Sequence, residues 1–363
     1  METRQIAVAL GERSYPIIIG QDILELAPGL IQAAGIRGRI GLITDDNVAP
    51  LYADRVREII QDAGYSVAQH VLPAGESQKR LARIEDICGA LLEAGLDRAS
   101  MIVALGGGVV GDIAGFAAGV FMRGIPFLQI PTTIVAQVDS SVGGKTGVNH
   151  PLSKNSIGVF HQPEAVLIDM QLLESLPDRE LRAGMAEVIK HGVIADAELF
   201  DHVVAQADAI LRKDLTQLQM PVARSCEIKA AIVAEDEKEQ GLRANLNYGH
   251  TFGHAIEAVS GYDTFLHGEA IALGMCAAGA LGRALGLVDD AFVTAQRDCI
   301  AAYGLPTRWP ELPLEATLDA MTRDKKARAG KLKLIVPTRI GAVVQRSDIT
   351  REQMAEALEH IRQ

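Results

Sequence analysis

The sequence predicts an N-terminal α/β domain with a mostly parallel sheet, followed by a mainly α-helical domain. Between residues 39 and 130, short apolar runs alternate with helix-length segments whose apolar residues recur every three or four positions. From about Pro177 onward, Ala- and Leu-rich helical segments replace this alternation. Strands that alternate with helices form parallel sheets. We therefore expect one domain over residues 1–177 and a second over residues 178–363.

The first domain is expected to open with a β-hairpin, because apolar residues alternate over 6–10 and a Gly-Glu-Arg-Ser turn leads into the apolar run 15–19. Four βα strands should follow, at residues 39–44, 66–72, 100–105 and 126–130. Each run is short and apolar, as is typical of a strand that is covered on both faces.

In the second half, Pro177-Asp178 is typical of a helix start. Helical segments should run to about residue 325, with breaks at Pro221, Gly241, Gly261 and Gly286. A short β pair, residues 331–336 and 341–345, and a final helix from residue 350 are expected to close the chain. Ligands are expected in a cleft between the two domains.

Composition excludes several classes of protein. The 363 residues carry 46 acids and 35 bases, a formal charge of −11, which disfavours binding to nucleic acid or to anionic lipid. No apolar stretch is long enough to span a bilayer, and the N-terminus lacks the apolar core of a secretory signal. The four cysteines form no Cys-x-x-Cys pair. We expect a soluble, cytoplasmic protein.

A glycine-rich turn follows the strand expected at 100–105. Gly106, Gly108 and Gly111 satisfy the Gly-x-Gly-x-x-Gly pattern of Rossmann-like domains, in which backbone N–H groups at a helix start bind a pyrophosphate. Tight strand-to-helix turns also use glycine without any ligand. The acid expected about twenty residues later is missing, but Asp45 and Asn47 follow another strand and are an alternative contact for the ribose. A helix N-cap provided by Asp46 or Asn47 is the structural alternative.

A second loop, residues 139–149, contains Gly143-Gly144-Lys145-Thr146. Asp139 stands where a nucleoside-triphosphate loop requires glycine, so that class of site is excluded. Two glycines beside a lysine still suit an anion, and Lys154-Asn155 adds another cation and an amide. A surface loop without a ligand is the alternative.

The third group of motifs concentrates histidines. His250 and His254 are four residues apart and share one face of a helix, while His267-Gly268-Glu269 follows shortly afterwards. Upstream, residues 187–191 place a carboxylate, a lysine and an imidazole on successive helical turns. Together these side chains offer a mixed nitrogen and oxygen site of the kind that catalytic zinc uses, although spacing alone does not select the ligands.

Read together, the motifs resemble the 3-dehydroquinate synthase family. They follow one another in the order that is typical of this family and span nearly the whole chain: Gly-Gly-Gly-Val-Val-Gly-Asp, Pro131-Thr132-Thr133, residues 139–149, Lys154-Asn155, Ala-Glu-Val-Ile-Lys, Gly-His-Thr-Phe-Gly-His-Ala-Ile-Glu, His-Gly-Glu and Asp324-Lys325-Lys326.

The resemblance implies an NAD-binding α/β domain, a helical domain and a site for zinc or cobalt in the cleft, usually in a homodimer. It implies that Glu187, His250 and His267 bind the metal, and that His254 contacts the substrate instead. The implied NAD contacts are Asp45, Asn47, Glu76, Ser77, Gln78, Lys79, Gly108, Val109, Val110, Gly111, Asp112, Thr132, Thr133, Lys145, Lys154, Leu172 and Ser175. The implied substrate contacts are Arg123, Asp139, Lys145, Asn155, Lys190, Lys229, Arg243, Asn247 and one of Lys325 or Lys326.

The family reaction, a step of the shikimate pathway, converts 3-deoxy-D-arabino-heptulosonate 7-phosphate to 3-dehydroquinate and phosphate. Other sugar phosphate cyclases share the scaffold but are expected to differ at the positions of Asn247 and His254. A metal-dependent NAD polyol dehydrogenase is a second alternative, although it has no need for several cations at a phosphate. A non-enzymatic nucleotide-binding protein would have no reason to keep metal ligands, phosphate donors and a proton acceptor together.

Overall fold

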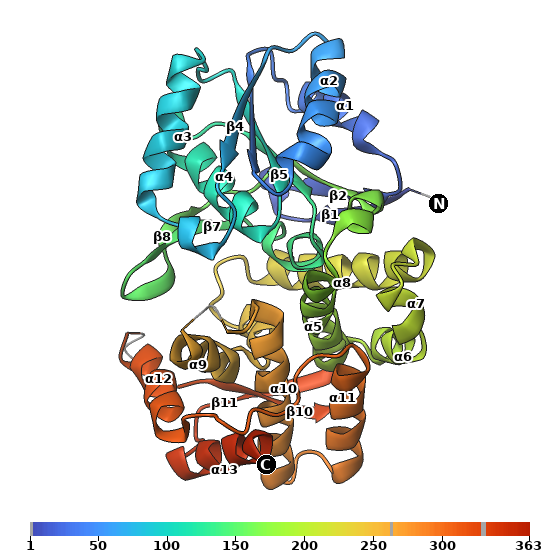
Figure 1. Cartoon of the computed structure of the whole chain (residues 1–363), viewed down its shortest axis with the longest axis vertical. Coiled ribbons are helices and arrows are strands. Elements are labelled where there is room, and N and C mark those ends of the chain that lie inside the picture. Colours follow the sequence, from blue (N-terminus) through green and yellow to red (C-terminus); the bar gives the residue numbers. More distant parts are fainter. Residues whose placement is uncertain (1–2, 262–263, 328–331) are drawn as a thin grey trace. The chain divides into compact units, whose positions relative to one another are not determined.

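The computed structural model describes residues 3–261, 264–327 and 332–363, which form two compact units (Figure 1). Unit 1 consists of Met1–Leu176 and Lys229–Ala234, and unit 2 consists of Pro177–Ile228 and Glu235–Gln363. Among the described residues, none of the helices combines the length and the apolar character needed to cross a lipid bilayer.

Unit 1 is built on a seven-stranded sheet with the strand order β1-β2-β9-β6-β5-β3-β4. The expected hairpin and the four expected βα strands are confirmed: only β1 is antiparallel to its neighbour, and all other pairs are parallel. The strand at Ala165–Asp169, β9, was not expected. The strands are β1 (Arg4–Val8), β2 (Tyr15–Gly20), β3 (Ile40–Asp45), β4 (Val67–Leu72), β5 (Met101–Gly106), β6 (Phe127–Pro131) and β9 (Ala165–Asp169).

Helices cover both faces of this sheet (Figure 1). In β5, Met101, Val103 and Leu105 belong to one apolar cluster, whereas Ile102 and Ala104 belong to the other. Successive side chains of a strand point to opposite faces, so β5 must be apolar at every position. The covering helices are α1 (Ala27–Ala33), α2 (Asp54–Asp62), α3 (Leu81–Glu93) and α4 (Gly108–Val120).

The expected anion-binding loop and the residues after it form an antiparallel hairpin, β7 (Lys145–His150) and β8 (Ser153–Phe160), rather than a loop alone. Glycines explain how it packs. A β-carbon on Gly158 would lie 2.0 Å from the carbonyl oxygen of Thr146, and one on Gly115 of α4 would lie 2.5 Å from Thr146 Cγ2. The two strands and α4 therefore approach more closely than side chains would allow.

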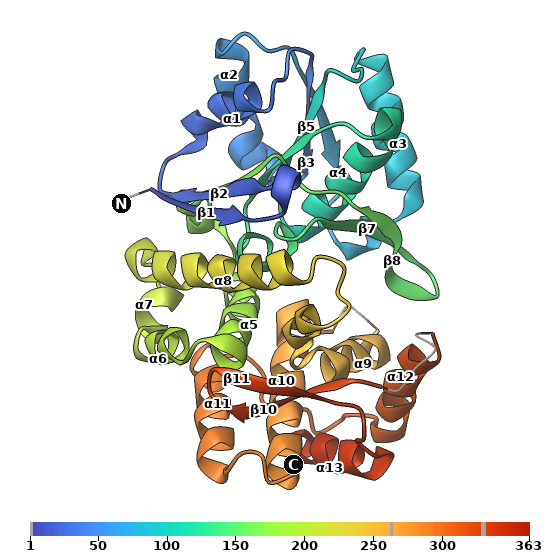
Figure 2. The same cartoon turned by 180° about the vertical axis from the view of Figure 1, so that it is seen from behind.

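Unit 2 is mainly helical, and α10 packs against α5, α9, α11, α13 and β10 (Figure 2). Nearly every residue of α10 after the first is buried, and many are Gly or Ala, which allows close helix contacts. The elements are α5 (Asp178–Ala195), α6 (Ala197–Ala205), α7 (Ala207–Leu211), α8 (Leu215–Glu235, whose residues 229–234 belong to unit 1), α9 (His250–Ser260), α10 (His267–Ala284), α11 (Asp290–Ala302), α12 (Leu314–Ala327), β10 (Leu334–Arg339), β11 (Ala342–Arg346) and α13 (Arg351–Arg362).

Most expected helix ends are confirmed, but the break at Pro221 is wrong, because α8 continues through that residue. Proline cannot donate to the carbonyl four residues earlier, which leaves the carbonyl oxygen of Gln217 without its helical partner. The ring of His202 lies 3.2 Å from that oxygen through Nε2 and replaces the missing donor. Gly261 and Gly286, both at positive φ, follow the ends of α9 and α10 as expected. The β pair and the final helix are confirmed, while Lys331 lies outside the described residues.

Gly268 provides a test of the helix packing in unit 2. A β-carbon at this position would lie 1.8 Å from the carbonyl oxygen of Ala183 in α5. We expect Gly268→Ala to destabilise the protein by about 1–3 kcal/mol, because backbone must move to relieve the overlap. Thermal unfolding followed by circular dichroism measures this loss.

The matched control is Gly89→Ala in α3, where an added β-carbon has no neighbour within 4 Å. Alanine favours helix over glycine by about 1 kcal/mol, so this variant should unfold at the same or a higher temperature. Equal unfolding temperatures for both variants would contradict the close approach of α10 to α5.

Candidate active site

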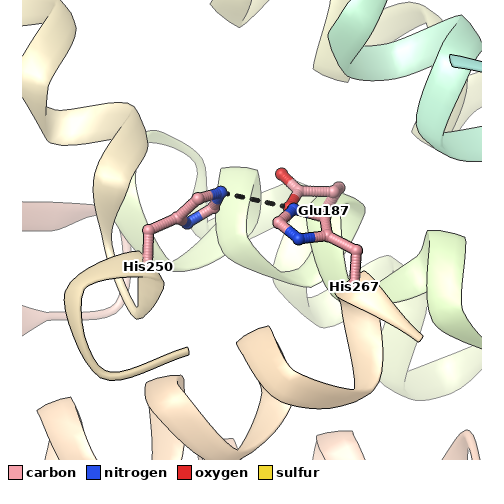
Figure 3. A group of neighbouring side chains, drawn as sticks. All are labelled: Glu187, His250 and His267. Carbon is pink, nitrogen blue, oxygen red and sulfur yellow. Dashed lines mark ion pairs between the residues drawn. The ribbon is translucent and has the colours of Figure 1, made fainter. Parts of the chain in front are cut away.

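Three potential metal ligands meet in unit 2: Glu187 from the middle of α5, and His250 and His267, the first residues of α9 and α10 (Figure 3). The Oε1 atom of Glu187 lies 3.5 Å from Nε2 of each histidine. The Glu187 side chain is fully buried, His250 is nearly so, and His267 is about one-third exposed. The structure thus brings together the three residues that the family resemblance named as ligands.

The other nitrogen of each ring also has a partner. Nδ1 of His250 lies 3.1 Å from the backbone carbonyl oxygen of Tyr248, and Nδ1 of His267 lies 3.1 Å from Oε1 of Glu257. A neutral imidazole that donates from Nδ1 has its lone pair on Nε2. In both rings Nδ1 is therefore occupied by a protein acceptor, and Nε2 is the nitrogen that faces Glu187 and is left for a metal.

The charges of this cluster are strongly coupled. Burial raises the pKa of Glu187, but Lys190, His250 and His267 outweigh it and hold the pKa well below its usual value. Burial lowers the pKa of His250 to about 3, against the opposing effect of Glu187. Burial also lowers the pKa of His267, but the carboxylates of Glu187 and Glu257 outweigh it and raise the pKa to about 9. At neutral pH His250 is neutral and His267 carries a proton that a metal would displace.

A divalent metal fits these residues. Oε2 of the buried Glu187 carboxylate is paired with Lys190, whereas Oε1 has no hydrogen-bond partner among the described residues and faces the two imidazoles at 3.5 Å, although a buried carboxylate oxygen normally accepts a hydrogen bond. Ligands about 2.1 Å from a tetrahedral ion lie about 3.4 Å apart, close to the distances found here. One carboxylate and two imidazoles leave a fourth position open, as catalytic zinc sites require.

His254 belongs to a second group. Its ligand atom and those of Glu257 and His267 lie within 4.8 Å of one another, and its ring centroid is 5.3 Å from that of His250. Unlike the members of the Glu187 group, His254 is exposed. The i,i+4 spacing thus places the rings of His250 and His254 side by side. His250, but not His254, belongs to the group that contains Glu187.

Several residues implied as substrate contacts already hold protein partners. Lys190 is buried and forms an ion pair with Glu187. Arg243 is buried and donates to the carbonyl oxygen of Glu237, and Asn247 Nδ2 donates to Glu239 Oε1 at 2.7 Å. Two residues of the charged run 235–239, Glu237 and Glu239, thus contact residues that were predicted to bind the substrate.

In unit 1, Lys229 and Asp139 come together: Nζ of Lys229 donates to the side chain and to the backbone carbonyl of Asp139. Lys79 is buried, forms an ion pair with Asp112 and donates to Oδ1 of Asn155. These five residues were expected in separate roles, with Lys79 and Asp112 at the nucleotide and the others at the substrate. Lys79 therefore connects Asp112, predicted to bind the nucleotide, with Asn155, predicted to bind the substrate.

The glycine-rich turn runs from the end of β5 into the start of α4, as expected. Buried hydroxyls of Thr44, Thr132 and Ser140 have no hydrogen-bond partner within the described part of the chain. Thr44 lies near the carboxyl end of β3 and Thr132 follows β6, while Ser140 Oγ would be 3.0 Å from a β-carbon on Gly108. Donors without partners and a backbone without β-carbons fit a phosphate- and ribose-bearing ligand.

Around Asp45, the proposed N-cap by Asp46 or Asn47 is wrong. The Asp45 carboxylate itself accepts from the backbone N–H groups of Asn47 and Val48, at 3.1 and 2.9 Å, and Asp46 accepts from Ala74 instead. The acid that ends β3 is therefore the one that accepts from the N–H groups of the turn. Burial raises the pKa of Asp45.

The remaining predicted NAD contacts lie on or near the same sheet. Leu172 is part of the core, and the hydroxyl of Tyr52 donates to Ser175 Oγ at 2.6 Å and to the Leu172 carbonyl oxygen at 3.3 Å. Thr133 Oγ1 accepts from the N–H of Ala136. The predicted NAD contacts Glu76, Ser77 and Gln78 form a 3₁₀ turn, and Glu76 Oε1 accepts from Asn149 Nδ2. Val109, Val110 and Gly111 form the first turn of α4, where Val110 is buried.

Three predicted cations lie at the periphery of unit 1. Arg123 is exposed, with the unusual φ of +69°, and Lys145 and Lys154 lie on β7 and β8. For Lys325 and Lys326 the side chains lie outside what the structure describes. Two residues with direct contacts to the sites were missed from the sequence, Tyr52 and Glu257. Glu257 had a signal, because its spacing of seven from His250 places both on one face of α9.

Family models and a known protein match most of this chain in sequence. The family model described as 3-dehydroquinate synthase N-terminal matches residues 69–183, and the model described as 3-dehydroquinate synthase C-terminal matches residues 184–327. A 3-dehydroquinate synthase of Shewanella piezotolerans is 46% identical over 358 residues, which cover 98% of this chain and 99% of that protein.

Two solved structures are also similar. A 2-epi-5-epi-valiolone synthase from Streptomyces hygroscopicus, with NAD+ and Zn2+ bound, has a TM-score of 0.90 and 28% identity, covering 97% of this chain and 98% of that one. A 2-deoxy-scyllo-inosose synthase complexed with carbaglucose-6-phosphate, NAD+ and Co2+ has a TM-score of 0.87 and 26% identity, covering 98% and 99%. Because both family models match in sequence order and the Shewanella relative aligns almost end to end, this chain belongs to the 3-dehydroquinate synthase family.

Proposed function

We propose that this chain catalyses the reaction of its family, the conversion of 3-deoxy-D-arabino-heptulosonate 7-phosphate to 3-dehydroquinate and phosphate. The reaction combines transient oxidation, phosphate elimination, re-reduction and an intramolecular aldol closure, which makes the enzyme a carbon–oxygen lyase. The cluster of Glu187, His250 and His267 carries the proposal, in a chain 46% identical to a 3-dehydroquinate synthase. We also propose a cytoplasmic homodimer.

Unit 1 is proposed to bind NAD and unit 2 a zinc or cobalt ion. When bound, NAD supplies a hydride acceptor that is restored within each turnover, and the metal supplies a Lewis acid for substrate oxygens. The ligands would be Glu187, His250 and His267. The unpartnered hydroxyls of Thr44, Thr132 and Ser140 and the start of α4 would contact the nucleotide, together with the residues implied by the family resemblance.

The chain's own residues would bind the substrate and move protons. We assign the phosphate to Lys145, Asn155 and one of Lys325 or Lys326, because a leaving phosphate needs cations and amides around its charge. Arg243 or Lys229 would bind the carboxylate, in exchange for the contacts with Glu237 and Asp139 described above. His254, the exposed imidazole beside His250, would accept the hydroxyl proton in the first step. Arg123, Lys190 and Asn247 would orient the substrate, whose aldol closure needs confinement above all.

The proposed activity is tested with metal-loaded protein, NAD and the heptulosonate phosphate. We expect equal amounts of phosphate and 3-dehydroquinate, without lasting absorbance at the wavelength of NADH, because the hydride returns to the substrate. Net NADH would favour the polyol dehydrogenase. Phosphate release only from a different sugar phosphate, with none from the heptulosonate, would favour another sugar phosphate cyclase.

The metal assignment is tested with Glu187→Gln and His267→Ala. Both variants should lose bound zinc or cobalt and nearly all turnover while retaining the wild-type circular dichroism spectrum, because each removes one of three protein ligands. Metal content is measured by elemental analysis after gel filtration. His70→Gln, in β4 of unit 1, is the control and should retain both metal and activity. Retained metal in both ligand variants would mean that the ligand assignment is wrong.

The role of His254 is separable from that of the ligands. His254→Ala should lower kcat by about 10²–10⁴-fold, the usual contribution of a general base, with unchanged metal content. The measurement is steady-state kinetics together with elemental analysis. Loss of metal in His254→Ala would instead assign it to the second ligand group, with Glu257 and His267.

A further inference from the structure

Glu257 is a buried carboxylate for which the proposed reaction has no use. It lies on α9, seven residues after His250 and three after His254, so all three side chains occupy one face of the helix. The Glu257 side chain is only 3% exposed. Burying an ionised carboxylate is costly unless a hydrogen-bonding or charged partner compensates for the lost water.

One compensating partner lies on the next helix. Oε1 of Glu257 is 3.1 Å from Nδ1 of His267, the first residue of α10, while Nε2 of the same ring is 3.5 Å from Glu187. The ring of His267 is therefore held between two carboxylates, one on each nitrogen. A proton donated from Nδ1 to Glu257 leaves Nε2, once a metal has displaced its own proton, as the nitrogen whose lone pair points to Glu187 and His250.

His250 shows the same arrangement with a weaker acceptor. Its Nδ1 lies 3.1 Å from the carbonyl oxygen of Tyr248, which is neutral and belongs to the backbone. His267 has a charged acceptor and a more exposed side chain, 31% against 11% for His250. A solvent-facing ring is less restrained by packing, so its orientation depends more on this one hydrogen bond.

We propose that Glu257 is the positioning residue of His267: it fixes the Nδ1–H tautomer and the ring plane, and so directs Nε2 to the metal site. The inference rests on the proposed metal ligands Glu187, His250 and His267. Glu257 itself does not bind the metal or the substrate. In its absence His267 would adopt either tautomer and rotate toward solvent, and the metal would be held by fewer preorganised ligands.

The test measures the affinity of the full chain for Co²⁺ by competition with a chromophoric chelator, without NAD or substrate. Glu257→Gln is nearly isosteric and should weaken Co²⁺ binding by about 10–100-fold, as is usual for carboxylates that orient a metal-bound imidazole. The Co²⁺ absorption bands of the loaded variant should also change. In the zinc-loaded protein, the Nδ1 proton of His267 should move upfield in ¹H–¹⁵N spectra of the histidine rings.

Two reference variants make the outcome specific. Glu187→Gln removes a proposed ligand and should abolish binding. Asp196→Asn removes a different buried carboxylate of unit 2, paired with Arg224 at 2.7 Å, and should alter stability without changing Co²⁺ affinity. If Glu257→Gln does not fold, Glu257→Asp serves in its place and should weaken binding in the same direction, because its shorter side chain no longer reaches Nδ1.

The possible results separate the two proposals. Co²⁺ affinity within threefold of wild type for Glu257→Gln, with binding lost in Glu187→Gln, overturns the positioning role alone. Binding lost as completely in Glu257→Gln as in Glu187→Gln makes Glu257 a ligand and also overturns that role. Unchanged binding in Glu187→Gln removes the proposed metal site, and with it the reason for a positioning residue.

Discussion

The burial of one carboxylate organises unit 2. Glu187 lies in the middle of α5 with no exposed surface, where an ionised group is unstable unless positive charge or a metal faces it. Lys190 and the two imidazoles supply that environment only if the first turns of α9 and α10 lie against α5. Glycine makes this possible: Gly249 and Gly253 let α9 lie against α10, and Gly268 lets α10 lie against α5. The close helix packing that these glycines allow is therefore also what brings the two imidazoles to the buried carboxylate.

Much of the fold could be predicted from the sequence because it follows from periodicity. The parallel strands are short apolar runs covered on both faces, and α5 has a proline at its N-cap. The hairpin β7–β8 escaped prediction because its strands are polar and rich in glycine, and are defined by close backbone approach rather than by apolar alternation. The break predicted at Pro221 was wrong for a related reason. Whether a proline ends a helix depends on whether another group donates to the carbonyl oxygen four residues earlier, and here that donor, His202, is distant in sequence.

The site was predictable where it is local in sequence and unpredictable where it is not. Spacing places His250 and His254 on one helix face without selecting the ligands, whereas the cluster of Glu187, His250 and His267 combines three helices. Only the family resemblance indicated the ligand set that the structure brings together. Glu257 lies seven residues after His250 and so shares its helix face, but a spacing of seven is common in any helix. Only the 3.1 Å contact between Glu257 and His267 distinguishes it. The pairing of Lys229 with Asp139, ninety residues apart, has no local signal.

The contact between His202 and the carbonyl oxygen of Gln217 has a consequence for how this family's sequences vary. Proline at position 221 is compatible with an unbroken α8 because an imidazole from α6 takes over the hydrogen bond. The two positions are therefore coupled: a substitution of His202 is harmful beside proline and mild beside a residue with its own N–H. Relatives that lack one of the pair should tend to lack the other, so covariation of positions 202 and 221 would identify a helix in which a side chain supplies the hydrogen bond that proline cannot form.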